Sequence, residues 1–100
     1  MTEAQVMDAL RQVLDPELGI NIVDLGLVYN VDLQDQNVHI ALTMTTRACP
    51  LHAYLTEEAT AAIHRVVPEA QTVDVEIVWD PPWSPAMMSD LAKQQLGWRS

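Results

Sequence analysis

The residue with the clearest chemical potential is Cys49, the only cysteine among 100 residues. It lies in segment 45–51, where a strand-like pattern gives way to a helical one, and we expect Cys49 to be the N-cap and Pro50 the first helical residue. The positive end of a helix dipole stabilises a thiolate and lowers the pKa of a thiol there. A thiolate is a nucleophile and a soft metal ligand. Free cysteines are also commonly buried and inert, so the local sequence leaves both interpretations open.

Four more polar residues are candidates for the same site. Asp15 and Glu17 flank a proline that stiffens the turn at 15–19, and their carboxylates either converge on the start of the second helix or are simply solvated. Thr45 and Thr46 end the preceding strand, where their hydroxyl groups either donate hydrogen bonds to a thiolate or only reflect β-propensity.

Other candidates carry weaker signals. His52, one turn into the helix, is a base, a second ligand or an exposed helix residue. Trp79 and Trp83 surround a double proline and form either an exposed apolar surface for a partner or a cover for the sheet edge. The sequence contains no paired CxxC, no HExxH, no phosphate-binding glycine loop and no nucleophile elbow. It therefore offers one thiol and a few polar residues rather than an established catalytic motif.

Composition narrows the class of partner. The chain has 14 acidic and 5 basic residues, a net charge of −9, and its basic residues are spread singly. Nucleic acids and anionic membranes bind clustered Lys and Arg, so neither is an expected partner. No apolar run is long enough to span a bilayer, and the N-terminus lacks the pattern of a signal peptide. We expect a soluble cytoplasmic protein with one domain over residues 1–100.

Hydrophobic periodicity and turn residues predict the element order α-β-β-α-β-α. The predicted elements are a helix capped at Thr2 and ending near Leu14, strands over 27–34 and 38–44 joined by a turn at 35–37, a helix from Pro50 ended by Pro68, a strand over 72–79, and a helix from Pro85 to Leu96 stopped by Gly97. The short turn makes the first two strands antiparallel, and the helical crossover makes the third parallel to the second. The fold class is therefore α/β (α+β) with a small mixed sheet.

Four segments together resemble the MIP-eighteen family of PaaD- and SufT-like proteins. They are Asp15 to Gly19, Asn21 to Tyr29, Thr45-Thr46 with Cys49-Pro50-Leu51, and Trp79 to Trp83 with Met88-Ser89. The resemblance implies a two-layer domain of the iron-sulfur cluster assembly type. It also implies a functional site comprising Cys49 as the reactive thiol and transient metal ligand, together with Asp15, Glu17, Thr45 and Thr46.

Two features depart from the family pattern. Ala48 stands where the family often has glycine, which alters how closely the backbone approaches a bound group. The sequence also ends at Ser100 without the cysteine-rich extension typical of phenylacetate-pathway members. We therefore expect the stand-alone assembly factor rather than the PaaD subtype.

The leading hypothesis is a non-enzymatic iron-sulfur maturation factor. Its Cys49 thiolate would transiently hold iron or a cluster, without a stably bound cofactor, for a scaffold or client apoprotein, and a homodimer would share the site. One thiolate cannot complete the coordination of a cluster. A second hypothesis is a metal-free adaptor that docks clients through Trp83 and the last helix. A third is a cysteine-nucleophile enzyme with His52 as its base.

Overall fold

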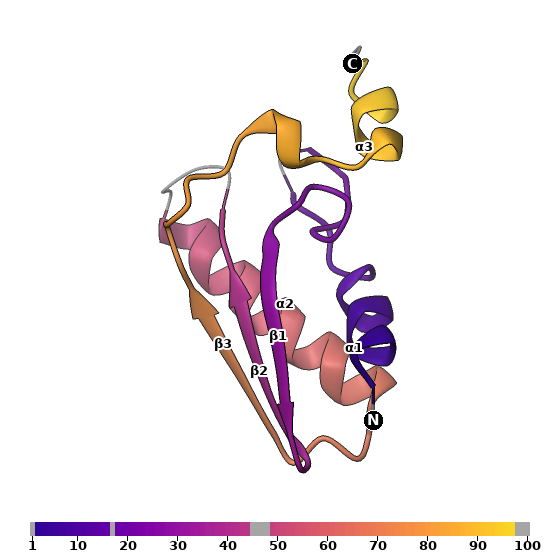
Figure 1. The fold of residues 1–100 in the computed structure, drawn as a ribbon, viewed down its shortest axis with the longest axis vertical. Helices are drawn as coiled ribbons and strands as arrows, with labels where there is room; N and C mark the ends of the chain where they lie inside the picture. The colour runs from indigo at the N-terminus through magenta and orange to yellow at the C-terminus, as the bar shows by residue number, and fades with distance from the viewer. Residues whose placement is uncertain (1, 17, 45–48, 98–100) are drawn as a thin grey trace.

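The chain folds into a three-stranded sheet with two helices packed on one of its faces (Figure 1). The computed structural model describes residues 2–16, 18–44 and 49–97, apart from the side chains of residues 49–51. The elements are α1 (Glu3–Leu10), β1 (Val28–Gln34), β2 (Asn37–Leu42), α2 (Cys49–Val66), β3 (Thr72–Ile77), the 3-10 helix η1 (Pro85–Met87) and α3 (Asp90–Gln95). The predicted element order and mixed α/β class are confirmed.

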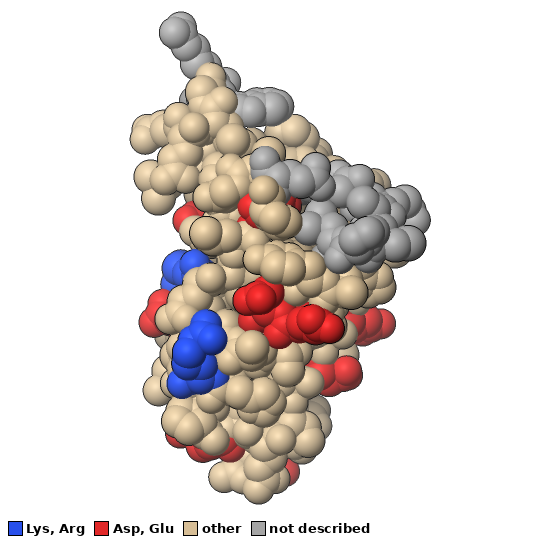
Figure 2. Space-filling model, turned by 180° about the vertical axis from the view of Figure 1, so that it is seen from behind, with Lys and Arg blue, Asp and Glu red and all other residues tan. Residues whose placement is uncertain are grey.

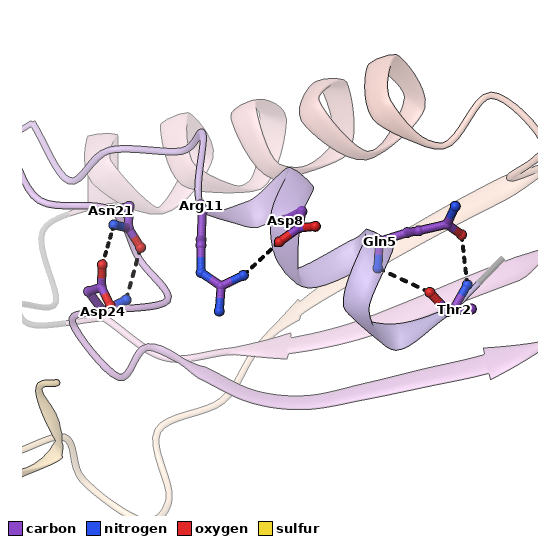
Figure 3. A network of polar contacts seen from close by, with 6 residues as sticks. All are labelled: Thr2, Gln5, Asp8, Arg11, Asn21 and Asp24. Atoms are coloured by element: carbon purple, nitrogen blue, oxygen red, sulfur yellow. Dashed lines mark hydrogen bonds and ion pairs between the residues drawn. The ribbon is translucent and has the colours of Figure 1, made fainter.

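Helix α1 begins as predicted and ends early. The Thr2 hydroxyl accepts a hydrogen bond from the amide of Gln5 at 3.2 Å, and the Gln5 side chain accepts one from the amide of Thr2 at 2.9 Å (Figure 3). This reciprocal pair is a capping box. The helix ends at Leu10 rather than near Leu14, because the amide of Val13 bonds three residues back to the carbonyl of Leu10 and tightens the chain into a turn.

The sheet has the order β1-β2-β3, with β1 antiparallel and β3 parallel to β2, as predicted. The turn between β1 and β2 is shorter than predicted, because Asn37 already pairs with Gln34. Only Asp35 and Gln36 remain in the turn. Asp35 has a φ of +56°, a left-handed conformation that aspartate tolerates better than most residues.

The core lies between the sheet and the helices. Helix α2 packs on β3 and α1, and α1 also contacts β1. One face of the sheet contributes Val31 and Leu33, then Val38, Ile40 and Leu42, then Val73, Val75 and Ile77. The central strand is buried on this face, whereas the apolar residues of β1 and β3 are half-buried. The helices add fully buried side chains such as Val6, Leu10, Leu55, Ala59 and Ile63.

The strict alternation predicted through Tyr29 is interrupted by a bulge in β1. Val28 pairs with Leu42 and Asn30 pairs with Ala41, so Tyr29 is the extra residue between them. Its hydroxyl donates to the carbonyl of Pro81 at 2.7 Å. The bulge therefore directs Tyr29 toward the C-terminal segment rather than continuing the apolar face.

The helix predicted from Pro85 to Leu96 is wrong as a single element. The chain forms η1, becomes extended at Met88, and starts α3 after Ser89, whose hydroxyl accepts from the amide of Ala92 at 3.2 Å. The amide of Ser89 donates to the carbonyl of Asp24 at 2.7 Å. This tertiary bond uses an amide that a continuous helix would need, so it separates the two short helices. Gly97 follows α3 with a φ of +75°, as predicted for a C-terminal stop.

Charge is unevenly distributed over the molecule. On the side that bears α2, acidic side chains are scattered while basic ones stand toward one edge (Figure 2). Residues 28–34, 37–42 and 72–77, which form the strands, include Asp32, Asp74 and Glu76 but neither Lys nor Arg. Among the described residues, no helix has the length and apolar character needed to cross a membrane.

Candidate functional site

Two of the predicted site segments, the Asp15 loop and the start of α2, lie toward one end of the sheet. Strands β2 and β3 run parallel, so their carboxyl ends lie together, and the connecting helix α2 starts at that same end (Figure 1). Cys49 is the first residue of α2, one position earlier than predicted. The cysteine is therefore a residue of the first helical turn, where backbone N–H groups lack helical acceptors.

A series of backbone hydrogen bonds connects the Asp15 loop to the end of β2. Ile22 donates to the carbonyl of Val13 at 3.0 Å, Leu27 donates to that of Ile22 at 3.0 Å, and Thr43 donates to that of Leu27 at 2.8 Å. In the sequence, Asp15 lies two residues after Val13, where this series begins. Segment 45–46 starts two residues after Thr43, where the series ends. The series thus links the chain just before Asp15 to Thr43, the residue that follows β2.

Asp15 is fully buried. Its Oδ1 accepts from the amide of Leu18 at 3.3 Å, while its backbone amide donates to Ile20 at 2.9 Å and its carbonyl accepts from Gly19 at 2.7 Å. Burial of a carboxylate costs free energy that only specific contacts offset. The alternative interpretation of the sequence, in which the Asp15 carboxylate is simply solvated, is therefore wrong.

Thr43 is the second buried polar residue at this end, with 1% of its surface exposed. The alternating pattern places it on the outward face of its strand, yet β2 ends at Leu42 and Thr43 turns inward. Among the described residues, Asp15 and Thr43 are the only polar side chains classed as buried. Asp15 lies in the loop before β1 and Thr43 directly after β2, and the hydrogen-bond series above links these two segments.

Asn21 and Asp24 hold the loop between Asp15 and β1. The Asn21 amide group donates to Asp24 Oδ2 at 2.7 Å, and its Oδ1 accepts from the Asp24 amide at 2.9 Å (Figure 3). Sequence reasoning missed this pair as a supporting feature of the site. The signal was available, because Asn followed three residues later by Asp is a pattern of local side-chain to backbone bonding.

The C-terminal segment crosses the same end of the sheet (Figure 1). Trp83 is half-buried, and its Nε1 donates to the carbonyl of Leu25 at 2.7 Å. This contact favours the interpretation of Trp83 as a cover over that of an exposed docking surface. Partner binding through Trp83 remains a prediction.

No contact among the described residues links the remaining candidates to this end of the sheet. Glu17, Thr45 and Thr46 lie outside the described residues, as does the side chain of Cys49. The His52 side chain belongs to an exposed residue of α2. Within the described part of the chain, no three His, Cys, Asp or Glu side chains are grouped to hold a metal ion.

Comparison with known proteins agrees with the motif-based resemblance. The Fe-S protein maturation auxiliary factor YitW of Bacillus subtilis is 46% identical over 93 residues, which cover 92% of this chain and 90% of that protein. SufT of Staphylococcus aureus, named in the same way, is 44% identical over 86 residues, covering 85% and 97%. A crystal structure of a domain of unknown function from Bacillus anthracis matches with a TM-score of 0.91 and 41% identity, covering 97% and 92%.

The family profile described as iron-sulfur cluster assembly protein matches residues 3–77. This span includes both helices of the core, all three strands, the Asp15 loop and Cys49. The family match and the two relatives together show that the chain belongs to the iron-sulfur cluster assembly protein family.

Proposed function

We propose that this protein acts in the maturation of iron-sulfur proteins by holding iron or a small cluster transiently at Cys49 and passing it to an apoprotein. Family membership and the names of two close relatives, both maturation auxiliary factors, support the maturation role. The observation that carries the part of Cys49 is its place in the first turn of the 18-residue helix α2. A long helix has a full dipole whose positive end favours the thiolate.

The buried polar residues support a fixed binding region. Asp15 holds the 15–18 turn through its bond to the amide of Leu18, and the hydrogen-bond series from Val13 to Thr43 fixes that turn relative to β2. A site on a rigid frame loses less entropy when it binds cargo. We propose that Asp15 positions the loop beside the thiol, whereas the thiol binds the cargo.

One thiolate per chain predicts labile binding. Each cluster iron requires four ligands, and thiolates dominate among them. This chain has a single cysteine, so the missing ligands must come from a second copy, a scaffold or the recipient protein. An incomplete ligand set favours transfer over storage. We therefore propose a carrier or delivery factor rather than an enzyme that makes and breaks covalent bonds in an organic substrate.

Anaerobic reconstitution with ferrous iron and sulfide tests the proposal. Wild type, Cys49→Ala, Cys49→Ser and His52→Ala are desalted after reconstitution, and iron, sulfide and the visible absorption spectrum are measured. We expect both Cys49 variants to lose most of the iron and sulfide, because the only thiolate is gone. His52→Ala should bind as wild type does, since it changes an exposed residue of the same helix. Equal iron content in Cys49→Ala and wild type would exclude the thiolate from the function.

A further inference from the structure

Strand β3 forms a free edge of the sheet. It pairs with β2 on one side, and Figure 1 shows no element beyond its other side. Among the described residues, no backbone hydrogen bond reaches β3 from that outer side. The amide of Val78 donates to the carbonyl of Leu42 in β2. The backbone groups of successive strand residues point to opposite sides, so Val73, Val75 and Ile77 direct their amides and carbonyls away from β2. An open row of such groups is a template for another strand.

The side chains of β3 differ between its two faces. Val73, Val75 and Ile77 are on the core side of the sheet, yet each is only half-buried. Asp74 and Glu76 are on the open side, where their side chains are 76% and 58% exposed. A strand added to this edge would extend the cover over the three apolar residues and place its alternate side chains beside the two carboxylates.

The open face of the sheet favours a cationic partner. His39 lies between Asp74, whose Oδ2 is 2.9 Å from Nδ1, and Glu76, whose Oε2 is 3.3 Å from Nε2. Asp32 pairs with His39 from the other side, and the strands carry neither Lys nor Arg. Asp32, His39 and Asp74 also line a hollow of about 290 Å³ on this face. Positive side chains are the complement of such a surface.

A second copy of this chain is a poor occupant of the edge. In antiparallel pairing, residues directly opposite each other lie on the same face of the sheet. The two-fold pairings that keep the helices on one side and align most of β3 therefore place Asp74 opposite Asp74, Thr72 or Glu76 of the other copy. Carboxylates face each other directly in the Asp74–Asp74 and Asp74–Glu76 registers, and like charges directly opposite destabilise the pair. In the Asp74–Thr72 register, the two Asp74 side chains are diagonal neighbours on the same face, which also brings like charges close together.

We propose that β3 accepts, as a fourth strand, an extended segment of a protein partner in which Lys or Arg alternates with apolar residues. The basic residues pair with Asp74 and Glu76, and the apolar residues extend the cover over Val73 and Val75. Because β3 ends where α2 begins, one end of the bound segment lies toward Cys49. The proposal rests on the proposed function for the partner's role as a donor or recipient of the cluster, but the binding step itself does not require the thiol.

Titration of the isotope-labelled full chain with synthetic peptides tests this binding step. The probe is an eight-residue peptide that alternates Lys or Arg with Val or Thr. One control peptide replaces its basic residues with Glu, and another has the same composition in a scrambled order. We expect saturable amide shifts along β3 for the alternating basic peptide, with slower hydrogen exchange at the outward amides of Val73 and Val75. Shifts confined to the helices, or equal binding of all three peptides, would overturn the proposal.

Two pairs of substitutions test whether the peptide is attracted by the β3 edge or by the net negative charge of the whole protein. Asp74→Asn with Glu76→Gln should weaken binding about fivefold, as expected for the loss of two cross-strand charge pairs. Glu57→Gln with Glu58→Gln removes the same charge from exposed positions of α2 and should leave affinity nearly unchanged. If both pairs of substitutions weakened peptide binding equally, the net charge of the protein would explain the attraction, and binding at the β3 edge would be refuted.

Val75→Pro tests the backbone contribution. Proline removes an outward amide, which edge strands tolerate, so circular dichroism should remain native while binding is lost. The charge variants decide the proposal even if this variant does not fold. Cys49→Ala should bind the peptide normally, and Asp74→Asn with Glu76→Gln should bind iron and sulfide normally. Failure of the edge and failure of the thiolate site are therefore distinguishable.

Discussion

At the scale of single residues, we propose different tasks for Asp15 and Cys49. Asp15 is fully buried and bonds to the Leu18 amide, so it shapes a loop. Cys49 begins a helix whose dipole favours the charged form of its thiol. The two residues therefore call for different experiments, one on stability and one on reactivity.

Replacement of Asp15 should separate its structural role from its effect on cargo. Asp15→Ala leaves the Leu18 amide without its acceptor, so the free energy of unfolding in urea should fall by about 1–3 kcal/mol. Asp15→Asn keeps an oxygen acceptor in place and should lose much less stability. If the alanine variant unfolds at the same urea concentration as wild type, the hydrogen bond from the Leu18 amide to Asp15 does not contribute to stability.

The reactivity of Cys49 should report its place at the helix start. Rates of labelling with iodoacetamide, measured against pH, should give a pKa below about 8.5, the ordinary value for a thiol, because the first turn stabilises the thiolate. Denatured protein in urea is the matched control, since it lacks the helix. Identical pKa values in the folded and denatured protein would contradict this expectation.

At the scale of elements, the C-terminal segment is held against the loop before β1. Gly26 has a φ of +77°, and a Cβ there would overlap the carbonyl oxygen of Met87 in η1. Trp83 bonds to the carbonyl of Leu25, and Ser89 bonds to that of Asp24. Three successive loop residues thus contact the segment, which fixes it across the end of the sheet.

Gly26→Ala should loosen this segment. The substitution adds backbone strain and a steric clash with η1, so trypsin should cleave faster after Lys93 in α3, and stability should fall by more than the roughly 1–2 kcal/mol of a left-handed alanine. Gly19→Ala is the matched control, since Gly19 has a similar φ of +71° with no atom near its would-be Cβ. Equal cleavage rates in the two variants would show that η1 does not depend on contact with Gly26.

At the scale of the whole molecule, one parallel β2-α2-β3 unit decides where the site lies. The crossover brings the start of α2 to the end where both strands finish, and the loop before β1 reaches the same end through its bonds to Val13 and Thr43. The face of the sheet opposite α1 and α2 carries the acidic residues of β3. The proposed cargo site and the proposed docking edge therefore occupy different parts of one small protein.

Association should depend on cargo. With one cysteine per chain, reconstituted protein should shift toward a dimer in size-exclusion chromatography with light scattering, because two chains together supply two thiolates. Chelation of the iron should restore the mass of the unloaded protein, and Cys49→Ala should not shift at all. A cluster-loaded monomer would show that non-thiolate ligands complete the coordination.

Several features of the fold follow from local sequence. The capping box at Thr2, the turn at Asp35 and the stop at Gly97 depend on neighbouring residues, and each was predictable for that reason. The bulge at Tyr29 and the break before Ser89 depend on hydrogen bonds to distant segments. Periodicity does not encode such partners, so it predicted an unbroken strand and an unbroken final helix in their place.

The sequence by itself determined the element order, the mixed sheet, the family resemblance and the limit set by a single thiol, because periodicity, turn chemistry and residue count are local properties. Only the tertiary structure decided that Asp15 and Thr43 are buried, and that β3 lies at an edge of the sheet. Burial and strand pairing depend on segments far apart in the chain. The residue type alone thus identified the thiol as a candidate, whereas the packing of distant segments determined the end of the sheet at which its helix begins.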